Sequence, residues 1–200
     1  MLDETTFSAF RDIGRDMFLR GMVSSHAGNL SVRTGDAIWI TRTGAMLGRI
    51  TPDDVIEVDR IGPDPIDSRA SSELAVHRAI YGATGAGAVV HAHPPYATLL
   101  SMLQDELTPI DSEGYYVLGR VHVKDIGTIG TAGLPESARA VSEALKEHRI
   151  VLLKGHGSFA RGDTLEHAYM ATSSLEASSF YLYHIRKPQG QGGFQGIDSK

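Results

Sequence analysis

The chain has 200 residues, of which 42% are hydrophobic and 22% are charged, a length that favours one domain with its own core. It has no cysteine, which excludes disulfides, thiolate metal sites and thiol nucleophiles. The net charge of −5 makes nucleic acid an unexpected partner, and no apolar run approaches the ~20 residues of a membrane span. With its acidic N-terminus, the sequence predicts a cytoplasmic globular protein.

The spacing of apolar residues predicts helices and strands in alternation along the chain. Gly21 is expected to end the first helix, the segment 34–36 to form a hairpin turn, and Asp163 to cap the last helix. Predicted helices cover 7–18, 73–81, 95–103, 135–146 and a segment after 163, and predicted strands cover 29–33, 37–41, 55–58, 88–93, 115–118, 121–126 and 150–153.

This alternation, together with the hairpin, indicates an α/β fold. We expect a single domain with a central mixed or antiparallel sheet that helices cover on both faces. The domain is predicted to span residues 1–186, and the glycine-rich segment 187–200 is predicted to be a flexible tail. The first strand is not followed by the G-x-G-x-x-G pattern of dinucleotide-binding domains.

Four side chains are candidate metal ligands. His91 and His93 lie two apart on a predicted strand, so their imidazoles point to the same face. His156 lies between two glycines, and Glu73 lies at the start of a predicted helix. One Glu and three His can complete a tetrahedral zinc site without cysteine, although each alone also fits an ordinary surface or turn residue. His77 is an alternative ligand, or a residue behind the ligands.

A second group of residues could bind a phosphate. Ser71 and Ser72 precede the same predicted helix, where free backbone N–H groups and the helix dipole attract anions. Asn29, Thr43 and Gly44 add polar side chains and exposed backbone N–H groups in loops. Each of these residues alone also fits an ordinary turn, so the interpretation depends on the neighbouring metal candidates.

These motifs together resemble those of the class II aldolase/adducin-head family. They occur in the family's order over about residues 5 to 185, and they are specific for the family rather than for a substrate. The matching segments are 26–33, 41–44, 51–54, 71–77, 91–94 and 155–157.

The resemblance implies a sheet–helix domain that assembles as a homotetramer, with active sites at the subunit boundaries. It implies that Glu73 is also the acid/base and leaves the metal when substrate binds. The implied ligands of one Zn²⁺ per subunit, with other divalent metals as alternatives, are Glu73, His91, His93 and His156. The implied phosphate-binding residues are Asn29, Thr43, Gly44, Ser71 and Ser72.

The reaction implied by the resemblance is the reversible cleavage of L-fuculose 1-phosphate, or a similar ketose 1-phosphate, to dihydroxyacetone phosphate and L-lactaldehyde. Zinc would act as the Lewis acid. The related ribulose-phosphate 4-epimerases have an Asp where Glu73 stands, which favours an aldolase. The segment 124–131 lacks the tyrosine that bacterial fuculose-phosphate aldolases have there, so the proton donor to the leaving aldehyde is unassigned.

Other reactions of the same family remain alternatives, because fold alone does not decide among them. They are 4-epimerisation of ribulose phosphate, dehydration of methylthioribulose phosphate and decarboxylation of a sugar-acid phosphate. A remote alternative is a non-catalytic interaction module like the adducin head. Loss of the metal ligands would mark such a module, and this chain has all four.

Overall fold

The computed structural model describes residues 2–62, 65–127 and 134–185. The helices are α1 (Glu4–Leu19), α2 (Leu74–Ala83), α3 (Pro95–Ser101), α4 (Ser112–Leu118), α5 (Pro135–Glu147) and α6 (Leu165–Ile185). The strands are β1 (Asn29–Thr34), β2 (Ala37–Thr41), β3 (Val55–Asp59), β4 (Ala88–Ala92), β5 (Glu106–Leu107), β6 (Val121–Lys124), β7 (Ile150–Leu153) and β8 (Gly157–Gly162). The predicted tail, 187–200, lies outside the described residues.

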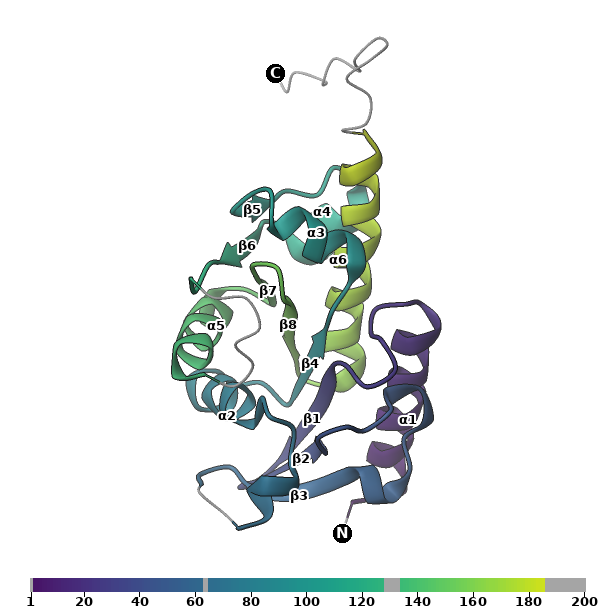
Figure 1. Ribbon diagram of the computed structural model, residues 1–200, viewed down its shortest axis with the longest axis vertical. Coiled ribbons are helices and arrows are strands. Elements are labelled where there is room, and N and C mark those ends of the chain that lie inside the picture. Colours follow the sequence, from purple (N-terminus) through teal and green to yellow (C-terminus); the bar gives the residue numbers. More distant parts are fainter. Residues whose placement is uncertain (1, 63–64, 128–133, 186–200) are drawn as a thin grey trace.

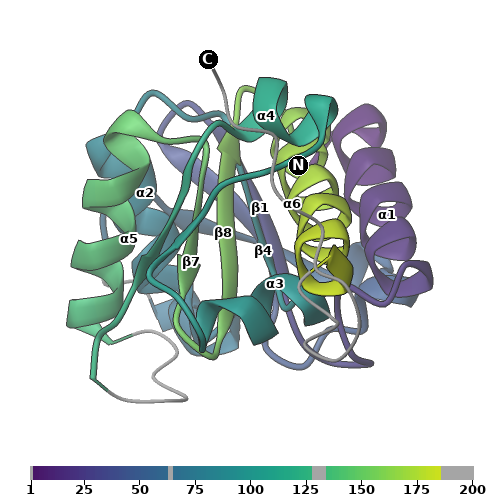
Figure 2. The same cartoon turned by 90° about the horizontal axis from the view of Figure 1, so that it is seen from above.

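The described strands form one sheet in the order β3-β2-β1-β4-β8-β7-β6-β5. Neighbouring strands are antiparallel except for β6 and β7, which run parallel. The sheet separates two layers of helices, with α2 and α5 on one face and α1, α3, α4 and α6 on the other (Figures 1 and 2). The predicted α/β fold, a mixed sheet covered on both faces, is therefore confirmed.

Each face of the sheet has its own apolar core, and the central strand β4 contributes to both. Because successive residues on a strand point to opposite faces, Val89 packs against the α2 and α5 side and Val90 against the α1 and α6 side. His91 follows in this alternation and points, like Val89, to the α2 side. The period of the strand therefore directs a histidine into the space between the sheet and α2.

One predicted strand is wrong: residues 115–118 belong to the helix α4. Asp111 begins this helix, and its carboxylate accepts a hydrogen bond of 2.7 Å from the backbone N–H of Gly114. Such an N-terminal cap satisfies one of the free donors of the first turn. Tyr115 and Tyr116, whose β propensity suggested a strand, are exposed at the surface of the helix.

Two details near the C-terminal end also differ from expectation. The strand β8 was not predicted, because its sequence is short and has glycine at both ends. The helix α6 begins after Thr164, whose hydroxyl accepts a hydrogen bond of 3.2 Å from the N–H of His167. Thr164 and not Asp163 is therefore its capping residue. No helix among the described residues has the length and apolar character needed to cross a membrane.

Candidate active site

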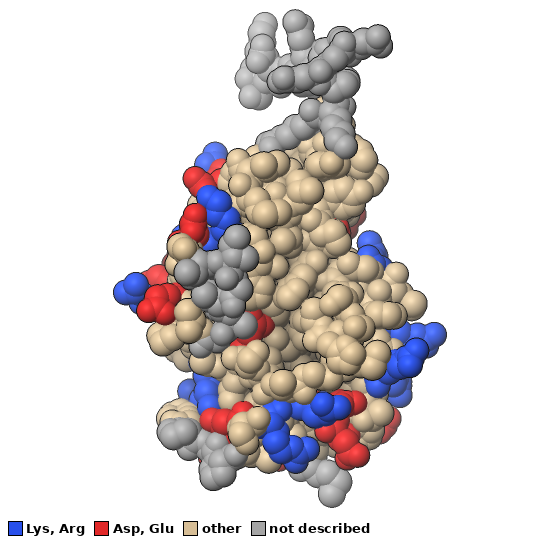
Figure 3. Space-filling model, viewed as in Figure 1, with Lys and Arg blue, Asp and Glu red and all other residues tan. Residues whose placement is uncertain are grey.

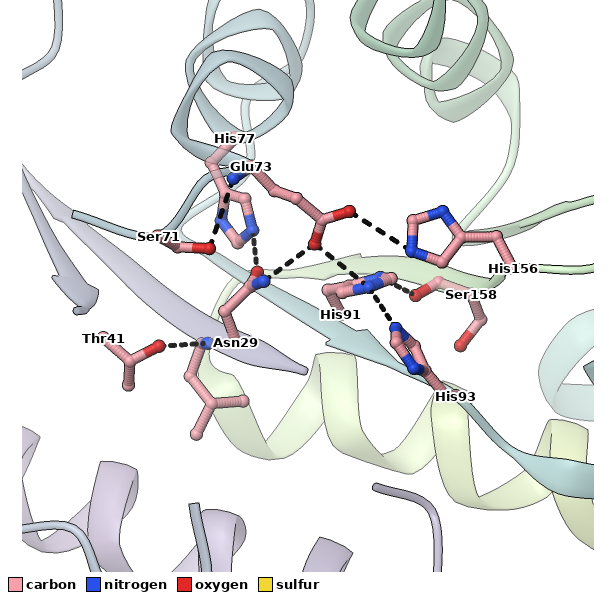
Figure 4. A network of polar contacts seen from close by, with 10 residues as sticks. Asn29, Thr41, Ser71, Glu73, His77, His91, His93, His156 and Ser158 are labelled. Atoms are coloured by element: carbon pink, nitrogen blue, oxygen red, sulfur yellow. Dashed lines mark hydrogen bonds and ion pairs between the residues drawn. The ribbon is translucent and has the colours of Figure 1, made fainter. Parts of the chain in front are cut away.

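The four candidate metal ligands come from distant parts of the sequence and meet at one end of the central strands. The first residue of β1 pairs with His91 of β4, and the end of β4 pairs with the start of β8. His93 follows β4, and His156 lies in the turn between β7 and β8. Glu73 immediately precedes α2, which covers this face of the sheet. Figure 4 shows the four side chains directed toward one another.

The ligand atoms lie at distances that one cation can bridge. His91, His93 and His156 each offer one ring nitrogen, and these three nitrogen atoms lie within 4.8 Å of one another. The Glu73 carboxylate reaches across, with Oε2 at 3.0 Å from His91 Nε2 and Oε1 at 3.4 Å from His156 Nε2. Three imidazoles and one carboxylate are a donor set that suits zinc.

The protonation of His91 tests whether a metal fits here. Its Nδ1 lies 2.9 Å from the backbone oxygen of Ser158, and a carbonyl oxygen can only accept. Nδ1 therefore carries the proton, and Nε2 has a free lone pair. That lone pair faces His93 Nε2 at 2.8 Å and the Glu73 carboxylate. A cation at this point could be bound by the His91 lone pair together with the neighbouring ligand atoms, so the residues present fit a metal ion.

Burial keeps the histidines in the form that binds metal. Loss of water around the ring, reinforced by the neighbouring His93 and His156, lowers the pKa of His91 well below its usual value. Burial likewise lowers the pKa of His93 to about 4. Both rings are therefore neutral at neutral pH, which leaves their nitrogen lone pairs available as ligands.

Glu73 combines a buried carboxylate with a place at the beginning of α2. Burial raises its pKa to about 7, although a hydrogen bond from Asn29 partly opposes this shift. The sequence prediction began this helix at 73, whereas the structure begins it at Leu74. The Ser71 hydroxyl accepts a hydrogen bond of 3.3 Å from the N–H of Glu73. A carboxyl with a pKa near neutral can both accept and return a proton.

A cavity of about 250 Å³ opens beside these ligands. Its lining contains the four candidate metal ligands and the five candidate phosphate-binding residues, namely Asn29, Thr43, Gly44, Ser71, Ser72, Glu73, His91, His93 and His156. On the face drawn in Figure 3, charged side chains gather around the edge, and most of the centre is uncharged. The cavity therefore joins the candidate metal ligands to the candidate phosphate-binding loops.

The loop that follows β2 is fastened to the segment before α2. Thr43 donates its hydroxyl hydrogen to the backbone oxygen of Ala70 at 2.6 Å, and a β-bridge joins Arg42 to Ala70. Gly44 has a φ of 71°, a left-handed conformation that glycine adopts without strain. This fastening brings Thr43 and Gly44 to the same cavity as Ser71 and Ser72.

Arg42 is a cavity residue that the sequence reasoning missed. Its guanidinium lies 2.7 Å from the carboxylate of Asp54 and donates to the backbone oxygen of Thr43 at 3.0 Å. These contacts hold a positive charge at the edge of the cavity, where it favours an anionic ligand. In the sequence, the one signal that could have identified Arg42 is its position between two threonines in the motif at 41–44.

The structure decides between the two alternatives for His77. Both of its ring nitrogens are engaged, Nε2 with Asn29 Oδ1 at 2.5 Å and Nδ1 with the Ser31 hydroxyl at 2.6 Å. His77 is fully buried and lies behind the candidate ligands rather than among them. Asn29 in turn donates from Nδ2 to Glu73 Oε2 at 2.7 Å. The second hydrogen on that nitrogen is left for another acceptor in the cavity.

An α/β domain with a His-rich centre beside a cavity of polar loops is characteristic of a metal-dependent enzyme. The family described as "Class II Aldolase and Adducin N-terminal domain" matches residues 8–181, and the chain belongs to this family. Class II aldolases are metal-dependent, and His91, His93 and His156 form the group that could hold the ion. The resemblance drawn from the motifs is thereby confirmed.

Relatives within the family differ in the reaction that their names describe. The solved structure of L-fuculose-1-phosphate aldolase from Thermus thermophilus is 42% identical, covers 96% of this chain and all of that chain, and has a TM-score of 0.90. The L-fuculose phosphate aldolase of Methanococcus maripaludis is 34% identical over 84% of this chain and 90% of its own length.

Two further relatives have dehydratase names. Methylthioribulose-1-phosphate dehydratase from Gluconobacter oxydans is 35% identical over 90% of this chain and 92% of its own length. A probable bifunctional methylthioribose-1-phosphate isomerase/methylthioribulose-1-phosphate dehydratase from Nocardia farcinica is 33% identical over 82% of this chain. The match covers only 32% of that longer protein.

Proposed function

We propose that the protein is a zinc-dependent aldolase of ketose 1-phosphates, with L-fuculose 1-phosphate or a similar sugar as its substrate. The observation that carries the proposal is the meeting of Glu73, His91, His93 and His156 beside a cavity of phosphate-binding character. The relatives named as L-fuculose phosphate aldolases support this substrate class. The products would be dihydroxyacetone phosphate and L-lactaldehyde.

Each group of residues has a separate task in this proposal. Thr43, Gly44, Ser71 and Ser72, with the remaining N–H of Asn29, hold the phosphate and so fix the sugar in register. A zinc ion held by Glu73, His91, His93 and His156 supplies the Lewis acid that polarises the ketose carbonyl. In cleavage, the C4 hydroxyl gives its proton to solvent water and becomes the aldehyde carbonyl, the C3–C4 bond breaks with its electron pair left on C3, and C3 then takes up a proton. Glu73, which would leave the metal when substrate binds, delivers the proton to C3.

Dehydration of methylthioribulose 1-phosphate is the second candidate function. It is favoured by a relative of that name that matches nearly the full length of both chains. A dehydratase needs the same kind of stabilised enolate, but it expels water instead of an aldehyde. The two functions therefore share the metal ligands and differ in what the rest of the cavity accommodates.

We expect the zinc-loaded protein to release dihydroxyacetone phosphate from L-fuculose 1-phosphate, in a reaction that a chelator stops. A coupled assay of dihydroxyacetone phosphate gives the rate, and a parallel incubation with methylthioribulose 1-phosphate, followed for loss of water, tests the second candidate. Release that persists with chelator contradicts the zinc assignment. Dehydration without release establishes the dehydratase instead.

We also propose that the active assembly is a homotetramer with active sites at the subunit boundaries, as the family resemblance implies. Large apolar side chains are exposed on this chain at Leu103, Tyr115 and Tyr116, and burial between subunits would remove them from water. Light scattering at micromolar concentration is expected to give the mass of four chains. A monomer at that concentration would contradict the proposed assembly.

A further inference from the structure

A row of buried polar side chains extends from Glu73 into the space between α2 and the sheet. Glu73 Oε2 bonds to Asn29 and Asn29 to His77, and the hydroxyl of Ser31 then joins His77 to Tyr81. The last contact, from Ser31 Oγ to the Tyr81 hydroxyl, is 2.7 Å long. None of the five residues is more than 6% exposed. We call Asn29, His77, Ser31 and Tyr81 the buried network.

The periods of a helix and a strand bring these residues together. Glu73, His77 and Tyr81 are spaced four apart, so they lie on one face of α2 and of the turn that leads into it. Asn29 and Ser31 are two apart on β1 and point to the same face of the sheet. The two sets alternate where helix and strand meet (Figure 4 shows the end nearest Glu73).

The hydrogen bonds of the buried network have one consistent direction. Asn29 gives an N–H to Glu73, so its carbonyl oxygen faces His77 Nε2, which must therefore donate. His77 Nδ1 then has a lone pair and accepts from the hydroxyl of Ser31. Ser31 in turn accepts from the hydroxyl of Tyr81. Each polar atom has the role that its neighbour requires, so reversing one bond leaves two like atoms face to face.

We propose that Ser31 and His77 are positioning residues that fix the carboxamide of Asn29 so that its NH₂ group, and not its carbonyl oxygen, faces Glu73. The proposal rests on the proposed function in one respect, namely that Glu73 takes part in catalysis. The side chains of Ser31 and His77 do not line the cavity and hydrogen-bond to none of the candidate metal ligands, so they act through Asn29. A flipped Asn29 would present its carbonyl oxygen to the carboxylate and push Glu73 out of place.

Ser31→Ala is the variant that separates positioning from simple support of the core. It removes the donor to His77 Nδ1, so His77 can move its proton to that nitrogen and cease to donate to Asn29. Ser142→Ala is the matched control, because Ser142 is a buried serine on α5 whose hydroxyl bonds to the backbone of its own helix. We expect Ser31→Ala to lower kcat about tenfold, because Asn29, once it is no longer held in place, loses its hydrogen bond to the carboxylate of Glu73.

Three further readouts distinguish this effect from a loss of folding. KM for the ketose phosphate and bound zinc per chain are expected to change less than kcat, because the other phosphate-binding residues and the three histidine ligands keep their contacts. The effect should also vanish in an Asn29→Ala background, because the double variant has nothing left to position. Independent losses that add in the double variant would overturn the proposal, as would a changed KM with an unchanged kcat.

Nitrogen NMR of the zinc-loaded protein tests the direction of the hydrogen bonds in the buried network without any turnover. The spectrum of ¹⁵N-labelled histidine is expected to show His77 protonated at Nε2 in the parent and as a mixture of the two neutral forms in Ser31→Ala. Loss of one set of signals in His77→Gln assigns the resonance. A parent His77 protonated at Nδ1 would overturn the proposal. If the parent cleaves none of the sugars, the proposed function fails, whereas this spectrum still decides the direction of the hydrogen bonds in the buried network.

Discussion

Replacement of Glu73 by Gln is expected to lower aldol cleavage about 10²- to 10⁴-fold, the range that a positioned acid/base contributes. Gln has nearly the shape of Glu and can still accept the hydrogen bond from Asn29. It cannot carry the proton, and it is a weaker ligand for a cation. The rate of dihydroxyacetone phosphate release from the zinc-loaded variant measures the effect.

Glu57→Gln is the matched control for this substitution, because Glu57 is an exposed residue of β3. Its rate should equal that of the parent protein. Measurement of bound zinc in Glu73→Gln separates the two roles of the residue. A variant that retains zinc but not activity has lost the proton carrier, and one that turns over at the parental rate would show that the assigned role is wrong.

The second large effect is expected from the removal of one imidazole. His93→Ala leaves two histidines and a carboxylate, so we expect less than one-tenth of the parental zinc after dialysis and no measurable cleavage. A metal that binds only the folded state stabilises it by about 4 kcal/mol at 1,000 times its Kd. For a chain of this size, chelation should therefore lower the Tm of the parent by about 10 °C.

The same chelation should leave the Tm of His93→Ala nearly unchanged, because that variant holds little metal to lose. His122→Ala, which alters a partly exposed histidine on β6 whose ring packs against His148 and does not line the cavity, should behave as the parent. Zinc content by atomic absorption and thermal unfolding with and without chelator are the measurements. An equal shift of Tm in His93→Ala would mean that the stabilising ion binds elsewhere.

Much of the fold was predictable, because local patterns determine its central elements. The apolar run before His91 and the hairpin at 34–36 lie where the structure has β4 and the β1–β2 turn. The 115–118 segment was mispredicted because its tyrosines favour a strand, whereas a single carboxylate, that of Asp111, caps a helix there. The strand β8 has few apolar residues of its own and is stabilised by pairing on both sides with β4 and β7.

The candidate site was predictable as a set of residue types but not as a geometry. Two histidines on alternate strand positions and one between glycines are visible in the sequence. The reach of Asn29 to Glu73, and the engagement of both nitrogens of His77, depend on how α2 lies across β1. That packing places residues 44 and 48 positions apart in contact, and no local pattern specifies such a pair.

The order of the strands has a consequence for how the protein is made. Asn29 pairs with His91, and His91 pairs with Phe159 on β8, so each join across the centre of the sheet closes a long loop of chain. Long loops lose much entropy on closure and form late in folding. On the ribosome, a chain that ends with β7 lacks both His156 and the Ser158 carbonyl that orients His91. We therefore expect the ion to enter only after β8 has left the ribosome, so that metal uptake follows the pairing of β4 with β8.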